Sequence, residues 1–330
     1  YKVSQNANPD LRWEQTEMEN VGLDFIAFNN RLSGTLEYYD KKTKDLLFTY
    51  EVAVPPFLYS QMLANVGSMS NKGVELSLTG DVIRKRNLTW SLSVNMARNR
   101  NTLTSLSNDL FSTSSIKYNN LSVRGSGNQT THILEEGKPV GSFYGWRFLR
   151  LDDAGKFVMD DMVDGKAGLT NEDWTHIGSA QPDLIYGISS SLRYNNFDFS
   201  FFLRGVSGNE IINVNRMRYG TTLWLPGANV LRSALSNGLK DNPRYSSYYI
   251  EDGSFLRLDN INIGYNFNVS KWGGGITRLR LYASAQNLFV ITKYTGIDPE
   301  VNLDGLNPGI EQSDYYPKAR TFSLGVNVSL

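Results

Sequence analysis

The 330-residue chain has no cysteine, only two histidines and no excess of either charge. Without cysteine it can form neither a disulfide nor a thiolate metal site. Its 33 basic and 33 acidic residues cancel, which argues against a nucleic-acid-binding protein. No run of about 18 apolar residues occurs, so the sequence excludes a transmembrane helix. His132 and His176 stand in no catalytic motif, and we expect no enzymatic activity.

The chain instead shows strict alternation of apolar and polar residues. In the last ten positions, Phe322, Leu324, Val326, Val328 and Leu330 alternate with Thr, Ser, Gly and Asn. A period of two predicts a strand with one apolar and one polar face. Ten residues tilted by about 45° cross roughly 25 Å, the height of the apolar band of a bilayer. This pattern predicts an all-β fold, a transmembrane antiparallel β-barrel.

The same alternation recurs earlier, in residues 74–78, 88–96, 184–194, 197–203, 261–269 and 279–285. The apolar faces of these segments carry no charged residue, as expected where Arg or Lys at the bilayer midplane costs about 2–4 kcal/mol. The opposite faces are rich in Ser, Asn, Gly and Thr, which indicates a wet lumen and not a packed core. A soluble β-sandwich, such as a carbohydrate-binding module, also alternates, but its strands are usually shorter.

The predicted connections alternate in length. We expect short ones near residues 29–30, 81–87, 137–141, 195–196 and 270–277, and long ones over 49–71, 104–129, 152–182, 207–254 and 292–318. Short periplasmic turns and long extracellular loops are typical of outer-membrane barrels. This pattern gives about eleven strands. Because bacterial single-chain barrels have an even number, we expect at least one strand before Tyr1 and interpret the chain as the C-terminal part of a larger protein.

Seven blocks in order resemble the SusC/RagA family of TonB-linked outer-membrane proteins. They are NPDLRWEQT (8–16), NKGVELSL (71–78), EGKPVGSFYGW (136–146), IGSAQPDLIYGIS (177–189), EDGSFLRLDNINIGYNF (251–267), LRLYASAQNLFVITKYTGIDPEV (279–301) and YYPKARTFSLGVNVSL (315–330). Each block alone is weak, but together they extend over nearly the whole chain. The resemblance implies that residues 1–330 form the C-terminal half of a 22-stranded barrel, with the plug domain and N-terminal strands outside this chain.

The resemblance also implies a function in the bacterial outer membrane. Family members actively import glycans, peptides or other large nutrients, powered by TonB with ExbB and ExbD, and a SusD-like lipoprotein covers the barrel as a lid. The expected partners are this lipoprotein, TonB–ExbB–ExbD, a glycan or peptide substrate, and membrane lipid or lipopolysaccharide. The family suggests a dimer of transporter–lipoprotein pairs. Alternatives are a passive porin or adhesin, or a structural barrel in a larger outer-membrane assembly.

Aromatic residues in the predicted long loops are candidates for solute binding. Tyr and Trp rings stack on sugars and anchor peptides, and loops on a rigid barrel tend to carry binding residues. We predict ligand contacts from Trp174, Tyr219, Trp224, Tyr248 and Tyr249. The alternative is that these rings pack beneath a lid or within their own loops.

One acidic stretch, DDMVDGKAGLTNED (160–173), partly matches a calcium-binding loop. Asp160 and Asp164 fall at positions 1 and 5 of an EF-hand-like loop, followed by Gly165 at position 6. Met162 and Asn171 stand where ligands are expected. The stretch therefore predicts either a weak Ca²⁺ site or a solvated acidic loop, and we expect no other cofactor.

Overall fold

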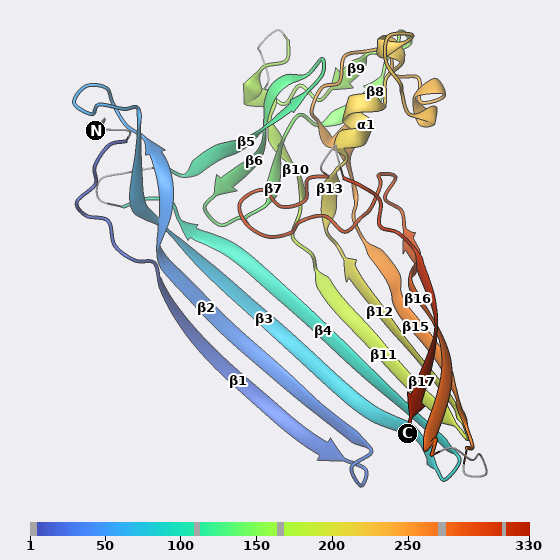
Figure 1. Cartoon of the computed structure of the whole chain (residues 1–330). Coiled ribbons are helices and arrows are strands. Elements are labelled where there is room, and N and C mark those ends of the chain that lie inside the picture. Colours follow the sequence, from blue (N-terminus) through green and yellow to red (C-terminus); the bar gives the residue numbers. More distant parts are fainter. Residues whose placement is uncertain (1–4, 109–112, 164–167, 270–274, 312–314) are drawn as a thin grey trace.

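The computed structural model describes residues 5–108, 113–163, 168–269, 275–311 and 315–330. Its main element is a curved antiparallel sheet of nine strands within these ranges, joined by short hairpins at one end and long connections at the other (Figure 1). We call these the turn end and the loop end. In spatial order the strands are β1 (Gln15–Ala27), β2 (Leu32–Glu51), β3 (Gln61–Lys85), β4 (Leu88–Ser105), β11 (Leu184–Tyr194), β12 (Phe197–Ser207), β15 (Phe255–Phe267), β16 (Arg278–Thr292) and β17 (Thr321–Ser329).

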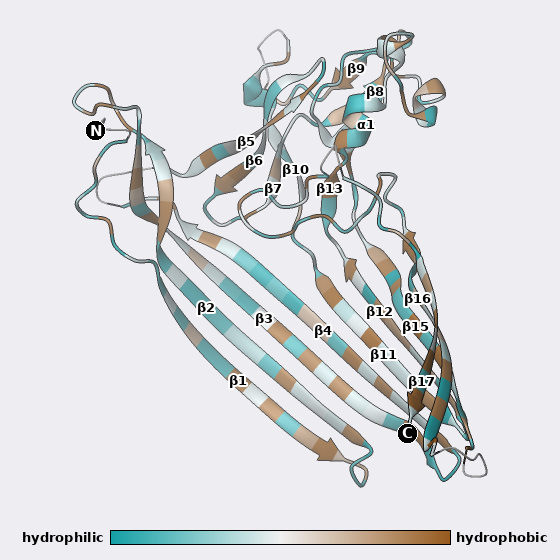
Figure 2. Cartoon of the chain, in the orientation of Figure 1, coloured by the Kyte–Doolittle hydropathy of each residue, from teal (hydrophilic) through white to brown (hydrophobic). Residues whose placement is uncertain are grey.

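The register of this sheet places polar residues opposite polar residues and apolar residues opposite apolar residues on neighbouring strands. One row from β4 to β17 is polar: Ser91, Ser191, Ser200, Asn262, Ser284 and Ser323. The adjacent row, on the opposite face, is apolar: Trp90, Leu192, Phe199, Ile263, Ala283 and Leu324. Figure 2 shows the resulting banding of hydropathy along the strands. A polar concave face and an apolar convex face confirm the predicted barrel wall.

Ser190 is the one polar residue that the sequence places on the apolar face of β11. Trp90 Nε1 donates a hydrogen bond to Ser190 Oγ at 3.0 Å, and the Ser190 side chain is buried. The hydroxyl is thereby satisfied where water is excluded, which removes the cost of an unpaired polar group. The exception therefore does not disturb the pattern.

The hairpins at the turn end follow from asparagine. Asn29 and Asn30 have φ of 55° and 62°, and Asn195 has φ of 51°. Asparagine tolerates this left-handed region better than most residues, which suits it to tight turns. The turns predicted at 29–30 and 195–196 are confirmed.

The long connections form a second folded part, the loop-end assembly (Figure 1). It contains a four-stranded sheet in the order β10-β7-β6-β5 and two two-stranded ribbons, β13–β14 and β8–β9. Its strands are β5 (Ser115–Val123), β6 (Gly127–Glu135), β7 (Ser142–Gly145), β8 (Phe148–Leu151), β9 (Phe157–Met159), β10 (Thr175–Ser179), β13 (Glu210–Ile212) and β14 (Ile250–Asp252). Its helices are α1 (Val214–Tyr219) and the 3₁₀ turns η1 (Asn171–Asp173), η2 (Thr222–Trp224), η3 (Arg232–Leu235) and η4 (Ser247–Tyr249).

The prediction of about eleven barrel strands differs from the structure. The hairpin expected around residues 137–141 is present, but its strands β6 and β7 belong to the loop-end sheet and not to the barrel wall. The physical reason is visible in β6, where Thr131, His132, Ile133 and Leu134 are all buried. A barrel strand would expose every second residue to lipid, whereas this strand packs on both faces.

The connection predicted over residues 49–71 is also shorter than expected. β2 continues to Glu51 and β3 begins at Gln61, so most of this stretch is strand. The extension is stabilised because Tyr50, Ala64 and Val66 form a small buried cluster at the loop end. Among the described helices, none is long and apolar enough to cross a membrane.

Candidate binding site at the loop end

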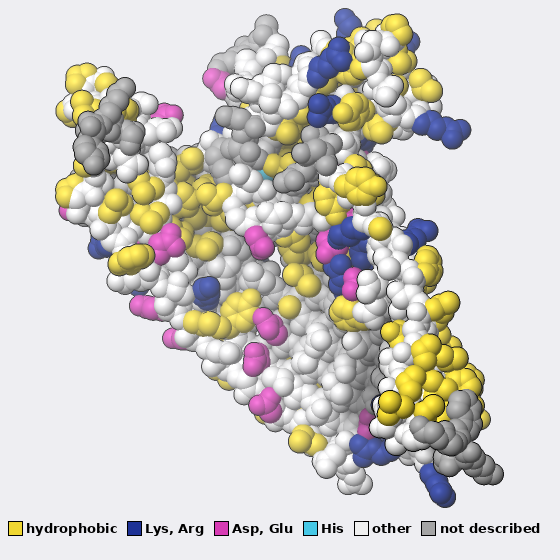
Figure 3. Space-filling view, viewed as in Figure 1, with side chains coloured by type: hydrophobic (Ala, Val, Ile, Leu, Met, Phe, Trp, Pro, Cys, Tyr) yellow, Lys and Arg dark blue, Asp and Glu magenta, His cyan; other side chains and the backbone are white. Residues whose placement is uncertain are grey.

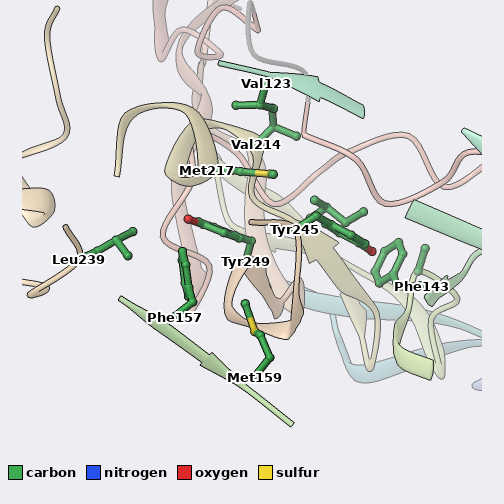
Figure 4. Close-up of a cluster of buried hydrophobic side chains, with 11 residues drawn as sticks. Val123, Phe143, Phe157, Met159, Val214, Met217, Leu239, Tyr245 and Tyr249 are labelled. Carbon is green, nitrogen blue, oxygen red and sulfur yellow. The ribbon is translucent and has the colours of Figure 1, made fainter. Parts of the chain in front are cut away.

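The interior of the loop-end assembly is an apolar core drawn from segments far apart in sequence (Figure 4). Phe143, Tyr245, Tyr249 and Met217 are fully buried in it, although they come from β7, α1 and the residues around η4. Phe157 lies 6.1 Å from Tyr249 between ring centroids, in an edge-to-face arrangement. Such pairs add about 0.5–1.5 kcal/mol beyond the burial of their area. The core therefore fixes how the surrounding loops are presented.

Tyr245 connects this core to the four-stranded sheet. Its hydroxyl donates to the carbonyl of Thr131 in β6 at 2.9 Å. Its ring lies against Gly145 so closely that a β-carbon there would stand 2.8 Å from Tyr245 Cε1. A glycine is thus required at position 145, because the Tyr245 ring occupies the space of a β-carbon. Burial also raises the pKa of the Tyr245 phenol well above its ordinary value.

One face of the four-stranded sheet gathers aromatic and charged groups, and we call it the aromatic face: Lys117, Glu135, Tyr144, Trp146, Trp174 and His176. Tyr144 pairs with His176 across β7 and β10, and their rings are 5.5 Å apart. Trp174 meets Tyr144 at 6.1 Å and Trp146 at 5.4 Å, both edge to face. These rings are half-buried, so their remaining surface is accessible.

Charged groups border these rings. Lys117 Nζ lies 4.9 Å from the Tyr144 ring centroid and 5.3 Å from that of Trp174. His176 Nε2 is 2.6 Å from Glu135 Oε2. An ammonium above two rings and a carboxylate–imidazole pair beside them offer both stacking surface and hydrogen-bonding groups. This combination suits the polar edges and flat faces of a sugar, or the side chains and backbone of a peptide.

The structure distributes the five predicted ligand-binding aromatics over different environments. Trp174 lies on the aromatic face, whereas Tyr249 is buried in the core and Tyr248 packs against it. Tyr219 ends α1, with the Arg218 guanidinium 5.4 Å from its ring centroid, and Trp224 lies under Arg124 at 4.5 Å. Tyr248 and Tyr249 both pack against Phe157, which belongs to a different long connection, so they contribute to the shared core of the loop-end assembly.

The acidic stretch is organised by a residue that the sequence did not single out. The Asp173 carboxylate accepts backbone N–H bonds from Thr170 at 2.7 Å, Val163 at 3.0 Å and Met162 at 3.1 Å, and these bonds lower its pKa. Asp160 is 3.6 Å from the Arg147 guanidinium.

Asp164, the other predicted calcium ligand, lies outside the described residues. Among the residues that are described, no group of three or more His, Asp or Glu side chains is placed to hold a metal. Calcium binding by Asp160 and Asp164 stays a prediction.

Comparisons with known proteins agree with this architecture. Residues 1–288 match the family model described as TonB dependent receptor-like, beta-barrel. The chain is 34% identical to TonB-dependent receptor SusC of Bacteroides thetaiotaomicron, covering 97% of this chain and 32% of that protein. It is 33% identical to TonB-dependent receptor P3 of Formosa agariphila, covering 98% and 35%. The solved structure of the RagAB peptide transporter superposes with a TM-score of 0.81 at 26% identity, covering 99% and 36%.

The chain belongs to the TonB-dependent receptor β-barrel family. It is therefore part of an outer-membrane protein, as the alternation and the sequence blocks predict. It spans about a third of the length of the curated relatives that it matches. Since such barrels have short periplasmic turns and long extracellular loops, the loop end is the extracellular end.

The concave face of this receptor barrel is its lumen wall. In Figure 3 that face is mostly uncharged and polar with scattered acidic side chains, whereas hydrophobic side chains crowd the outer surface along β16 and β17. Glu37 and Glu75 face each other on β2 and β3 in the polar register. The lumen wall therefore presents hydroxyls, amides and carboxylates.

Ion pairs tie the last long connection to the lumen wall near its extracellular end. Arg257 on β15 is buried and donates from Nη2 to Asp298 Oδ1 at 2.7 Å. Arg204 on β12 donates to Glu300 Oε2 at 3.0 Å, and Lys318 pairs with the same carboxylate. Burial raises the pKa of Glu300, but the bonds from Arg204 and Lys318 outweigh it and hold that pKa at about 2. Glu300 is therefore ionised at neutral pH and holds the connection in place.

Proposed function

We propose that this chain supplies lumen wall and extracellular loops to a TonB-dependent importer of large nutrients, glycans or peptides. Membership of the receptor family carries the proposal, and the likeness to a solved peptide transporter supports it. The family that the chain belongs to consists of TonB-dependent receptors, and we propose transport without chemical conversion. TonB with ExbB and ExbD would provide the energy, and a SusD-like lipoprotein would cover the extracellular end, with transporter and lid pairs forming a dimer.

The aromatic face is the proposed first contact for the solute from this chain. Its half-buried rings stand beside a lysine and a carboxylate–imidazole pair. Surfaces of this kind bind solutes that combine flat faces with polar edges. Of the five predicted aromatic residues, Trp174 is the one whose position favours direct contact with the solute. The polar lumen wall then provides a wet path below it.

The proposal is tested first by gentle-detergent purification of the full-length protein from outer membranes, with mass spectrometry of the eluate. A roughly stoichiometric SusD-like lipoprotein is the expected result, together with co-eluting oligosaccharides or peptides that define the substrate class. Recovery of the barrel alone would favour a passive porin or adhesin, and recovery with unrelated surface proteins would favour a structural barrel.

The role of the aromatic face is tested by Trp174→Ala in the full-length protein. The substitution should weaken solute affinity by about tenfold, because a lost aromatic contact is worth about 1–1.5 kcal/mol. Tyr265→Ala is the matched control, since the Tyr265 ring meets Phe197 edge to face on the lipid-facing side, and this variant should leave affinity unchanged. Equal affinity of wild type and Trp174→Ala, measured by calorimetry, would remove the aromatic face from the binding site.

A further inference from the structure

The outer face of the barrel changes character toward the extracellular end of β2, β3 and β4. The last fully apolar row is Leu23, Leu36, Leu76 and Met96. The next row ends in Arg98, and the row after it contains Glu19, Asp40, Lys72 and Arg100. Directly opposed residues in a sheet point to the same face, so these charges are on the lipid-facing side and not in the lumen. A basic cluster therefore borders the apolar band.

A groove of about 580 Å³ opens at this border. Four basic residues line it: Lys42, Lys44, Lys72 and Arg100. Ser70 and Thr102 stand beside Lys42 in one register row and add hydroxyl groups to the lining. No carboxylate is among the described residues that line the groove.

The basic side chains of the groove are only partly neutralised from its rim. Lys72 Nζ lies 2.9 Å from Asp40 Oδ2, and Lys44 Nζ is 3.8 Å from Glu17 Oε1. Within the described ranges, Lys42 and Arg100 make no ion pair, and both side chains are exposed. Lys42 stands opposite Glu17 in register, and its charge also acts on the Asp40 carboxylate. Two exposed cations that make no ion pair, together with the Thr102 hydroxyl, form a site for a multiply charged anion, to which a guanidinium can donate two hydrogen bonds.

The height of the groove identifies the anion. Arg100 stands four residues beyond Met96 along β4. Four residues at about 3.3 Å, on a strand tilted by about 45°, place Arg100 about 9 Å above the last fully apolar row. Lys72 stands two residues beyond Val74, the last apolar residue of β3 on this face, and is therefore about 5 Å above it, so the groove begins within the headgroup zone. Headgroups occupy roughly the first 5–8 Å outside the hydrocarbon on each side of a bilayer. The groove thus opens at headgroup level in the extracellular leaflet.

We propose that this groove binds the phosphate groups of a phosphorylated lipid headgroup, the lipopolysaccharide of the outer leaflet, with its acyl chains lying on the apolar rows below. Arg100 and Lys42 hold the phosphate, Lys72 and Lys44 add positive charge, and Thr102 donates a hydrogen bond. The lipid is a lateral ligand of the barrel wall, so this site is independent of the solute path through the lumen.

The experiment uses delipidated full-length protein in mild detergent, titrated with the diphosphorylated glucosamine lipid of lipopolysaccharide and followed by native mass spectrometry. Wild type should bind it, and the same lipid with both phosphates removed should bind poorly. Lys42→Gln/Arg100→Gln should weaken binding about 30-fold, because each basic side chain near an anionic surface contributes about 1 kcal/mol to the binding free energy. Lys41→Gln/Arg193→Gln removes the same charge from the lumen face and should bind as wild type does.

Further readouts keep the test decisive. Heat-modifiable migration on gels establishes that each variant forms a folded barrel, so a loss of lipid cannot reflect misfolding. Inorganic phosphate at the same concentration should not displace the lipid, since it lacks the acyl chains that lie on the wall. Unchanged lipid binding by Lys42→Gln/Arg100→Gln, or equal binding of the dephosphorylated lipid, overturns the proposal. A variant that keeps the lipid but changes oligomeric state would instead assign the groove to contacts between copies of the protein.

Discussion

The barrel wall and the loop-end assembly bury apolar side chains in opposite ways. On the wall, Leu324 is 89% exposed and Phe322 70% exposed, because their surroundings are lipid. In the loop-end assembly, Tyr245 and Phe143 are fully buried against other parts of the same chain. The wall therefore depends on the bilayer for its apolar contacts, whereas the assembly is stabilised as a soluble domain is. Four changes separate these two modes of stabilisation.

Tyr245→Ala should have the largest effect and confine it to the loop-end assembly. Deleting a fully buried aromatic ring costs about 3–5 kcal/mol through lost contacts and a cavity. Proteolysis of the folded full-length protein should then cut the loops around residues 123–249 far faster, while the barrel band keeps its heat-modifiable migration. Tyr245→Phe removes only the bond to the Thr131 carbonyl and should cost about 1–3 kcal/mol. Loss of the folded barrel in Tyr245→Ala would contradict the separation of the two parts.

Leu324→Arg should act on the wall alone. A cation on the lipid face costs about 2–4 kcal/mol near the bilayer midplane, measured as the free energy of folding into phospholipid vesicles. Ser323→Arg is the matched control, since the neighbouring side chain faces the water-filled lumen and the change there should be close to neutral. If the two substitutions were equally costly, the assignment of the faces of β17 would be wrong.

His132 makes the assembly sensitive to pH. It is fully buried, and burial lowers its pKa from 6.5 to about 4, although Nε2 bonds to the Pro308 carbonyl. Because the folded-state pKa is depressed, its contribution is complete above pH 6.5 and is lost as the pH falls toward 4. The loss amounts to about 3 kcal/mol, measurable as denaturant unfolding of the assembly followed by tryptophan fluorescence.

His132→Gln should abolish that loss between pH 6.5 and 4. Burial raises the pKa of Glu210. A raised carboxyl pKa has the opposite effect to that of His132, since it increases the stability of the folded state as the pH falls. Between pH 6.5 and about 5 the variant should therefore show a flat or slightly rising stability, whereas nearer pH 4 the lowered pKa values of Asp173 and Glu300 reduce the stability of both proteins. A decline as steep as that of wild type would show that another group is responsible.

Trp90→Phe should have the smallest effect, on the wall. The substitution leaves Ser190 Oγ without its donor on the apolar face, at a cost of about 1 kcal/mol. Adding Ser190→Ala should recover most of this loss, since no polar group then needs a partner. A double-mutant cycle of vesicle folding measures the coupling, and a coupling of zero would mean that the bond contributes nothing.

The same contrast explains what the sequence could predict. On the wall each residue faces either lipid or water, so a period of two is sufficient to assign the faces of β4, β11, β12, β15, β16 and β17. This assignment by a period of two fails for β6, where Thr131 to Leu134 are buried on both sides of the strand. As a result, the sequence pattern places β6 and β7 in the barrel wall. Local alternation does not reveal which sheet a strand joins.

The candidate site shows the same limit. Trp174 was predicted from its residue type and its loop, but its neighbours Tyr144 and Lys117 lie 30 and 57 residues away in sequence. Tyr249 belongs to the same class of residue as Trp174 and is buried, because its partners Phe157 and Met217 come from distant segments. Residue type identifies candidates, and only the packing of remote segments decides which of them face solvent.

One feature of the wall bears on how such a protein diversifies. β4 and β11 pair without interruption from Leu88 opposite Tyr194 to Ala97 opposite Ile185, although residues 106–183 lie between the two strands in the chain. The hydrogen-bonded ladder is the same as if a tight hairpin joined them. Recombination could therefore replace this whole insertion, including the aromatic face, without shifting the register of a single wall strand. A lineage can in this way exchange its extracellular surface while inheriting the barrel wall unchanged.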